Sequence, residues 1–161
     1  ERGKDQVINV QQRTSLYQTI DRLLRAGLIA IQETTREERR PERTVYALTS
    51  AGDEMAHTWM RAMLSTPARE FPEFPAGLSF VMLLTPETAG ELLSQRRESL
   101  TKRIAELQLE LRSEVDGQPI PRFALLETEY QVAVAIAEAK WIDGVLHDFR
   151  TGKLTWTPGP V

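Results

Sequence analysis

The fold of this chain is decided by residues 14–52, which read TSLYQTIDRLLRAGLIAIQETTREERRPERTVYALTSAG. The first third of this stretch repeats apolar residues at the i, i+4, i+7 and i+8 spacing of one helical face. These residues are Leu16, Ile20, Leu23 and Leu24. Gly27 follows, and glycine readily takes the left-handed conformation that ends a helix. The pattern therefore predicts a short amphipathic helix over residues 15–26.

Two strands with a long polar connection follow the predicted helix. Residues 28–33 are mostly apolar, and residues 44–48 alternate side chains between two faces, as a strand does. The connection over residues 36–43 is rich in arginine and glutamate, so it cannot bury itself and projects into solvent or onto a ligand. Residues 49–52 then open a helix that we expect to reach residue 64. Helix, hairpin and helix in this order are typical of a winged helix, which predicts double-stranded DNA as a partner.

The second half of the chain is predicted to be helical. Residues 71–75 hold two prolines at a spacing that excludes a helix interior, so we place a boundary here between domains 1–66 and 67–161. Residues 76–84 form an apolar run that predicts a short buried helix. The next segment, Thr85-Pro86-Glu87, offers a cap, a proline in the first turn and an acid near the positive helix end. A helix from there to residue 112 would be roughly 40 Å long.

This long helix has the apolar rhythm of a coiled-coil seam, which Arg97 interrupts. The seam residues are Leu93, Leu100, Ile104, Leu107 and Leu111. The expected fold is mainly α with a small β-hairpin. It comprises a winged helix-turn-helix DNA-binding domain followed by an all-α antiparallel helical dimerisation domain.

The last predicted helix, residues 122–149, carries two apolar stripes where a helical hairpin needs only one. The first stripe is Leu126, Tyr130, Ala133, Ala137, Trp141 and Val145. The second is Leu125, Val132, Ile136, Ala139, Ile142 and Leu146. A helix that is apolar on two sides must be buried on two sides. We therefore expect a homodimer and assign the dimer contact to the first stripe.

Several of these residues together resemble the PadR family of transcriptional regulators. They are Leu16-Tyr17-Gln18 with Arg22-Leu23, then Gly27-Leu28-Ile29, and Tyr46-Ala47-Leu48-Thr49 with Gly52. The resemblance implies that residues 15–26 form the recognition helix and that residues 75–156 form the helical dimerisation region of the longer family members. Family members normally have two helices before the recognition helix. Only residues 1–10 precede it here, so we expect a chain truncated at its N-terminus.

Candidate DNA-binding residues lie at the start of the recognition helix and at the hairpin tip. The helix start meets the major groove, where glutamine can pair with adenine and arginine with guanine. The tip arginines can contact phosphates or enter the minor groove. The expected residues are Gln11, Gln12, Arg13, Thr14, Ser15, Tyr17, Gln18, Arg36, Arg39, Arg40 and Arg43. The alternative is an ordinary solvated helix start and loop, since glutamates intersperse the tip.

Three tryptophans are candidates for an effector pocket. The resemblance implies flat hydrophobic effectors, because some family members bind these between the DNA domains and the C-terminal helices. We assign effector binding to Trp59 and Trp141. The alternatives are core packing, which we favour for Trp59, and a dimer contact, which we favour for Trp141. Trp156 lies in an irregular tail and has no assigned role.

Other classes of function have little support in the sequence. There is no cysteine, no apolar run near the roughly 18 residues of a membrane span, and no phosphate loop, nucleophile elbow or metal-ligand spacing. The net charge of −3 is unevenly distributed along the chain. Residues 1–43 hold nine basic and seven acidic residues, and the remaining residues hold eleven basic and sixteen acidic ones. We expect no enzyme, no cofactor and no metal.

The predicted function is that of a cytoplasmic, homodimeric, effector-responsive repressor on a pseudo-palindromic operator. Its expected partners are double-stranded DNA, a second copy of the chain and a small hydrophobic or aromatic effector, with no membrane. The alternatives are a small-molecule sensor and a protein-interaction module without direct DNA readout.

Overall fold

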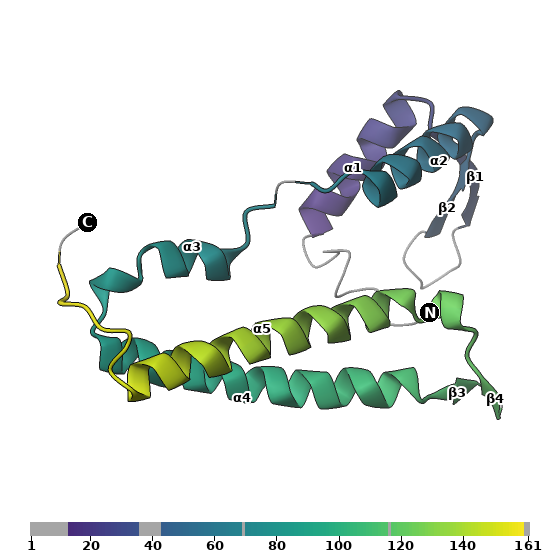
Figure 1. Ribbon diagram of the computed structural model, residues 1–161. Helices are drawn as coiled ribbons and strands as arrows, with labels where there is room; N and C mark the ends of the chain where they lie inside the picture. Colours follow the sequence, from purple (N-terminus) through teal and green to yellow (C-terminus); the bar gives the residue numbers. More distant parts are fainter. Residues whose placement is uncertain (1–12, 36–42, 69, 116, 160–161) are drawn as a thin grey trace. The chain divides into compact units, whose positions relative to one another are not determined.

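The computed structural model describes residues 13–35, 43–68, 70–115 and 117–159. The chain divides into two compact units, Glu1–Glu70 and Phe71–Val161. The first unit contains helix α1 (Arg13–Arg25), strands β1 (Ile29–Thr35) and β2 (Arg43–Leu48), and helix α2 (Ser50–Ser65) (Figure 1). The mainly helical fold with a small antiparallel hairpin is thus confirmed.

The end of α1 is fixed by a glycine, as the sequence predicts. Gly27 has a φ of 69°, and the Leu28 amide reaches back to the Leu23 carbonyl at 3.0 Å, which closes the last turn. Strand β1 then pairs antiparallel with β2, with Ile29 opposite Leu48. The register shifts between Ile31 and Glu33, a bulge that adds twist to the hairpin.

The junction between β2 and α2 ties the three parts of the first unit together. Thr49 caps α2, because its hydroxyl accepts from the Gly52 amide at 3.0 Å. The same hydroxyl donates to the Gly27 carbonyl at 2.7 Å, and the Thr49 amide donates to the Leu28 carbonyl at 3.1 Å. A Cβ added at Gly52 would lie 1.9 Å from the Leu28 carbonyl oxygen. Glycine is therefore the residue that lets α2 start against the end of α1.

Gly52 is the one buried residue among the described residues of the first unit. Helix α2 approaches the hairpin closely at this glycine, while its larger apolar side chains are uncovered within this unit. The uncovered residues are Met55, Trp59, Met60 and Met63. Trp59 is 50% exposed, so the core packing that we favoured for it is not found among the described residues.

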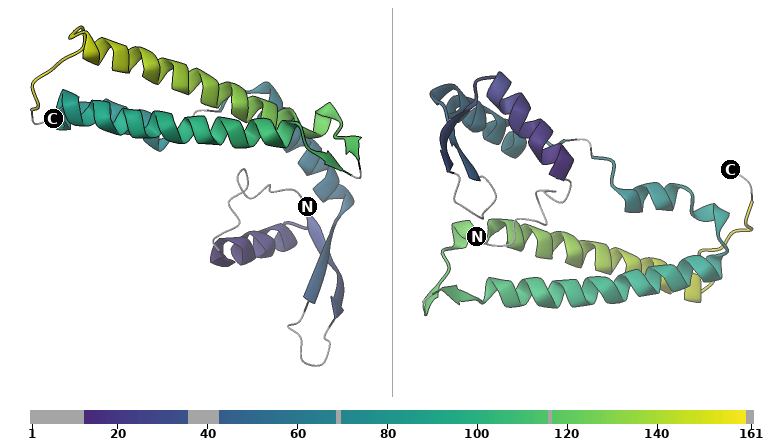
Figure 2. Two further views of the ribbon diagram at one scale, coloured as in Figure 1. Left: turned by 90° about the horizontal axis from the view of Figure 1, so that it is seen from below. Right: turned by 180° about the vertical axis from the view of Figure 1, so that it is seen from behind.

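The second unit is built on two long antiparallel helices. Its elements are α3 (Glu73–Ser79), the 3-10 turn η2 (Val81–Leu83), α4 (Pro86–Leu111), strands β3 (Glu114–Val115) and β4 (Gln118–Pro119), the 3-10 turn η3 (Arg122–Ala124) and α5 (Leu126–Arg150). Helices α4 and α5 lie side by side in all three views (Figures 1 and 2). Thr85 caps α4 by accepting from the Thr88 amide at 3.2 Å, and Pro86 takes the first helical position, as predicted.

The apolar core of the described chain lies between α4 and α5. The buried hydrophobic residues are Ala89, Leu93, Leu107, Leu125, Ala135, Ala139 and Ile142. Of the predicted seam on α4, Leu93 and Leu107 are buried and the other three residues are half-buried. Arg97 interrupts the apolar pattern of this seam. Its Nε donates to Asp143 Oδ1 on α5 at 2.8 Å. The ion pair places a charge at the edge of the seam without leaving it unpaired.

The segment before α4 differs from the prediction in two ways. Helix α3 begins at Glu73 and includes Pro75, because a proline in the first helical turn removes no hydrogen bond that the helix would make. The apolar run over residues 76–84 is not a buried helix. The first residues of the run belong to α3, which ends at Ser79, and the 3-10 turn η2 follows. No residue of α3 or η2 is buried.

The C-terminal tail turns back onto the end of this segment, at η2 and Leu84. The indole nitrogen of Trp156 donates to the Leu84 carbonyl at 2.9 Å, and its ring lies 5.5 Å from the Phe149 ring. The Gly159 amide also reaches the Met82 carbonyl at 3.4 Å. Trp156 thus joins the end of α5 to the connection between η2 and α4. Among the described residues, no helix combines the length and apolar character that crossing a membrane requires.

Candidate nucleic-acid interface

The outer face of α1 is polar and open to solvent. Leu23 and Leu24 turn inward and are half-buried, while Tyr17 is 67% exposed and Gln18 is exposed beside it. Gln18 has a hydrogen-bonding amide, and the Tyr17 ring offers both an apolar face and a hydroxyl. These two side chains are free to reach base edges if α1 enters a groove.

Two arginines and one acid extend the same outer face toward the end of α1. Arg22, Arg25 and Asp21 are all exposed. The Arg25 Nε donates to the Asp21 carbonyl at 3.3 Å, and an Arg22 terminal nitrogen lies 3.4 Å from the Thr19 hydroxyl. Both arginines sit in the last turn, where they also complement the negative helix end. Neither arginine is among the predicted DNA-binding residues, although the helical period already places both beside Gln18.

The structure describes only part of the candidate DNA-binding set. Tyr17 and Gln18 lie together on α1, as expected from their spacing. Gln11, Gln12, Arg36, Arg39 and Arg40 lie outside the described residues. For Arg13, Thr14 and Ser15 at the start of α1, and Arg43 at the start of β2, the backbone alone is described. Their role at a DNA surface stays a prediction.

Helix α5 separates its two apolar stripes onto opposite faces. Thr128, Ala135, Ala139 and Ile142 are buried against α4. On the other side, Leu126 is 54% exposed and Tyr130 is 71% exposed. The exposed face also includes Ala133, Val134, Ala137 and Trp141, with half-buried Val145 at its edge. Ile136, which we placed in the stripe that packs on α4, is 45% exposed and does not bury itself there.

Polar contacts between α4 and α5 fix the pair in one antiparallel register. The Arg96 Nε donates to Glu138, and an Arg103 terminal nitrogen donates to the Gln131 amide oxygen at 3.0 Å. Arg97 and Asp143 add a third pair farther along. Sliding α5 by one helical turn would break these contacts together. The exposed face of α5 is therefore held in a defined orientation relative to α4.

Trp141 has an aromatic neighbour within the second unit. Its ring meets the Phe74 ring edge-on at a centroid distance of 6.1 Å, and the Arg96 guanidinium carbon lies 3.7 Å from the Phe74 centroid. Trp59 belongs to the first unit. The two candidate effector residues thus belong to different units, and their effector role stays a prediction.

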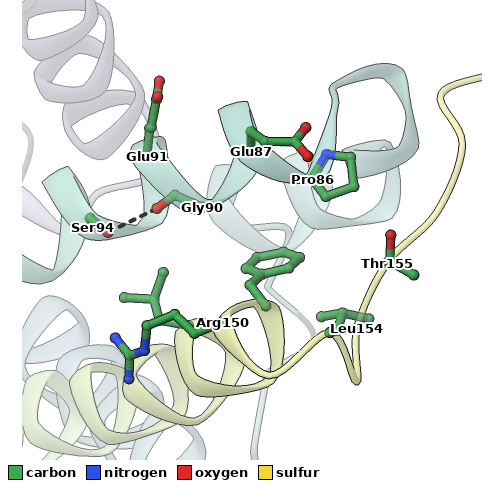
Figure 3. Close-up of a pocket in the computed structure, with 11 residues that line it drawn as sticks. Pro86, Glu87, Gly90, Glu91, Ser94, Arg150, Leu154 and Thr155 are labelled. Atoms are coloured by element: carbon green, nitrogen blue, oxygen red, sulfur yellow. Dashed lines mark hydrogen bonds between the residues drawn. The ribbon is translucent and has the colours of Figure 1, made fainter.

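Two cavities open on the second unit. One, of about 330 Å³, lies between α3, η2 and α4 and has mainly apolar walls. The other, of about 440 Å³, lies where the start of α4 meets the end of α5 and the tail (Figure 3). The lining of the second cavity includes the charged residues Glu87, Glu91 and Arg150 beside apolar ones. Neither Trp59 nor Trp141 lines these two cavities.

One ion pair of the second unit shifts the pKa values of its two partners. Arg122 on η3 donates to both carboxylate oxygens of Glu129 on α5, at 2.9 and 3.0 Å. These hydrogen bonds hold the pKa of Glu129 below its ordinary value. The pair links η3 to the first turns of α5. In the described part of the chain, no group of three or more His, Cys, Asp or Glu residues could hold a metal ion.

Comparison with known proteins shows that most of the first unit is similar to a family of regulators. Residues 5–58 match the transcriptional regulator PadR-like family. This confirms the resemblance that residues 16–52 carry. No curated protein sequence matches the chain with significant similarity.

Over more than four-fifths of the chain, the fold is similar to that of solved regulators. Bacillus subtilis PadR in complex with operator DNA has a TM-score of 0.67 at 18% identity, over 86% of this chain and 78% of that one. The same protein in complex with p-coumaric acid has a TM-score of 0.64 at 17% identity, over 86% and 79%. A PadR-like transcriptional regulator from Bacillus cereus has a TM-score of 0.57 at 20% identity, over 83% and 74%.

Proposed function

We propose that this PadR-like chain is a DNA-binding transcriptional repressor that acts as a homodimer and is released from its operator by a small-molecule effector. The observation that carries the proposal is the α1–β1–β2–α2 unit, whose family match covers the helix that exposes Tyr17 and Gln18. The first unit is assigned to DNA, and the second to dimerisation and effector response. A cytoplasmic location is part of this proposal, because the solved neighbours come from bacteria, whose chromosome lies in the cytoplasm.

In this proposal α1 is the recognition helix. Its first residues, up to Gln18, read base edges in the major groove, while Arg22 and Arg25 lie near the phosphates. The arginines of the hairpin tip make further phosphate contacts. Support comes from the exposed polar face of α1 and from the solved PadR complex with operator DNA.

The dimer in this proposal forms through the exposed face of α5. That face is apolar, lies opposite the face that packs on α4, and is about 25 residues long. A two-fold dimer uses the same patch on both copies. Two recognition helices related in this way suit a pseudo-palindromic operator with half-sites roughly 34 Å apart.

Release by an effector needs a ligand that prefers one spacing of the two recognition helices. A ligand shifts a conformational equilibrium only by its difference in affinity for the two states. The solved PadR complex with p-coumaric acid supports a small acid as effector. Bound effector would favour a dimer whose recognition helices no longer fit both half-sites.

The DNA-reading role is tested by substitution on α1. Duplexes bound by the full chain are first selected from a random pool, and Gln18→Ala is then compared with the chain unchanged. Loss of a bidentate base contact is worth about 1–3 kcal/mol, so the affinity should fall roughly 5- to 150-fold and discrimination at one base pair should relax. Gln95→Ala, on an exposed position of α4, is the matched control and should bind as the parent does. Equal loss in both variants would contradict the placement of α1.

The dimer role is tested by adding one charge to the exposed face of α5. Ala137→Glu places an unpaired carboxylate inside the proposed contact, which should weaken the dimer at least tenfold in sedimentation equilibrium. Ala105→Glu puts the same charge on an exposed position of α4 outside that face and should leave the dimer intact. If Ala137→Glu sediments as a stable dimer, the contact lies elsewhere.

A protein-interaction module is the second candidate, because α2 exposes an apolar side. Met60 is 53% exposed and Met63 is 68% exposed, next to half-exposed Trp59. Uncovered apolar patches mark interaction sites in soluble proteins. This candidate predicts DNA binding that is weak and insensitive to the identity of Gln18.

A further inference from the structure

Asp21 lies on the same outer face of α1 as Tyr17 and Gln18. It follows Tyr17 by four residues and Gln18 by three, and at 3.6 residues per turn such neighbours share one side of a helix. All three side chains are exposed. In the proposed function this side of α1 enters the major groove, so Asp21 meets the DNA one helical turn after the two residues already assigned to base reading.

The carboxylate of Asp21 has no partner in the described part of the chain. Arg25, one turn farther along α1, donates its Nε to the backbone carbonyl of Asp21 at 3.3 Å and not to its carboxylate. A terminal nitrogen of Arg22 lies instead 3.4 Å from the Thr19 hydroxyl. Among the described residues, none forms a hydrogen bond or an ion pair with the Asp21 carboxylate. Its oxygens are therefore available to a group outside the chain.

A carboxylate at this position does not stabilise the helix and opposes binding to the DNA backbone. Asp21 lies beyond the first turn of α1, so the positive end of the helix does not stabilise it. Aspartate is also among the weaker helix formers. Charges within roughly 10 Å of each other interact at moderate salt, so Asp21 repels the phosphates that Arg22 and Arg25 attract. The direct contact with DNA that a carboxylate favours is with a hydrogen-bond donor on a base edge.

Cytosine is the base that offers a carboxylate such a donor in the major groove without an acceptor of its own beside it. Cytosine presents its N4 amino group, adenine presents its N6 amino group beside the N7 acceptor, and guanine and thymine present acceptors. An ionised aspartate accepts hydrogen bonds and donates none, so cytosine attracts it while guanine and thymine repel it. Gln18 differs, because its amide both donates and accepts and can therefore pair with adenine.

We propose that Asp21 selects a cytosine in each half-site of the operator by accepting a hydrogen bond from the cytosine N4 amino group. This inference rests on the proposed function. Residues three apart on a helix have Cβ atoms about 5–6 Å apart, and stacked bases are about 3.4 Å apart. The cytosine therefore lies within about two base pairs of the base that Gln18 reads. At other sequences the unpaired carboxylate disfavours binding, which raises specificity further.

The test repeats the selection of duplexes from a random pool with the full chain carrying Asp21→Asn or Asp21→Ala. The parent should select a position at which cytosine is preferred over thymine roughly fivefold or more. Asparagine pairs with adenine, so Asp21→Asn should replace cytosine by adenine there, and Asp21→Ala should leave no preference. Glu98→Gln removes one negative charge from an exposed position of α4 and is the matched control, which should select the sequence of the parent.

The selected position must also agree with the geometry of α1. Gln18→Ala should relax the preference at a position within about two base pairs of the cytosine and leave the cytosine itself selected. A preference that depends on Asp21 but lies farther from the position read by Gln18 would overturn the proposed contact. A cytosine preference that persists unchanged in both Asp21 variants would also overturn it, because the carboxylate would then be an ordinary solvated group.

Folding and general affinity for DNA are measured in the same variants. Because Asp21 is exposed, amide exchange in β1 and β2 should match the parent, and binding to a duplex of random sequence should become tighter. Loss of all DNA binding in both variants would overturn the inference. Failure of the parent to select any duplex would overturn the proposed function together with this inference, whereas a selected sequence that does not depend on Asp21 overturns this inference alone.

Discussion

Replacing Gly52 by alanine should break the first unit while leaving the second intact. The added Cβ would lie 1.9 Å from the Leu28 carbonyl oxygen and 2.8 Å from the Leu28 carbonyl carbon, distances that real Cβ atoms essentially never show. Both opposing atoms are backbone, so no side-chain rotation relieves the clash. The start of α2 must retreat from the end of α1 by at least about 1 Å to restore a 3.0 Å contact.

That retreat removes the hydrogen bonds that join the three parts of the unit. The bonds of Thr49 to the Leu28 and Gly27 carbonyls are 3.1 and 2.7 Å long, and neither survives a displacement of this size. Each contributes about 0.5–1.5 kcal/mol, and overpacking adds about 1–3 kcal/mol. The better helix propensity of alanine returns about 1 kcal/mol at most. The expected net loss of stability for this unit is about 1–5 kcal/mol.

Hydrogen exchange measured by mass spectrometry reports the loss of stability separately for the two units. Amides of β1 and β2 should lose protection by roughly 5- to several-thousand-fold in Gly52→Ala, while α4 and α5 keep theirs. Gly77→Ala is the matched control, because its Cβ meets no atom within 4 Å and alanine is the better helix former. Protection of the hairpin that is equal in Gly52→Ala and the parent would refute the reasoning.

Three further predictions follow from single contacts. Thr49→Ala removes the cap of α2 and should cost the first unit about 1–2 kcal/mol in urea unfolding, and no change would contradict the capping role. Trp156→Phe keeps an aromatic ring but loses the donor to the Leu84 carbonyl. Amide exchange at η2 should therefore accelerate while exchange in α5 is unaffected. Unchanged exchange at η2 would show that this hydrogen bond does not hold η2 in place. Arg122 lowers the pKa of Glu129 mainly by hydrogen bonding, so the pair's contribution is complete above the unfolded-state pKa and is lost as the pH falls through the lower folded value. An NMR titration should show the Glu129 pKa return toward its ordinary value in Arg122→Ala, and an unshifted value would disprove the cause.

The elements that the sequence predicted well are those with local signals. The apolar period of α1, the glycine after it and the cap of α4 act within a few residues, so their bounds could be read directly. The two stripes of α5 were also predictable, because a helix has one period and its two faces show as two sets of residues. The structure adds which face packs on α4 and which stays exposed.

The features that escaped prediction depend on contacts between distant residues. The partner of Arg97, for example, is Asp143, which lies 46 positions away, and no local pattern joins them. The start of helix α3 at Glu73 was missed because two prolines dominated the pattern, although Pro75 falls in the tolerated first turn. The cavity beside Arg96 forms only where α3, η2 and α4 come together, so no local sequence pattern indicates it. The predicted effector residues were tryptophans instead.

For the same reason, the DNA-binding surface could be predicted only in part from the sequence. The helical period of α1 grouped Tyr17 and Gln18 on the outer face, and the structure exposes both. It also places Arg22 and Arg25 on that face, and neither was among the predicted DNA-binding residues. Which of these residues touches a base depends on the docked position of α1, and that position depends on the dimer.

The most direct test of the central claim is the salt dependence of binding between the full chain and its selected duplex. A dimer that sets two α1 helices and two hairpins on the backbone should neutralise at least about four phosphates. The logarithm of the binding constant should therefore fall with the logarithm of salt concentration at a slope of about −3.6 or steeper. The slope should become shallower in Arg25→Ala. A binding constant that does not change with salt would contradict DNA recognition and favour a protein partner for the first unit.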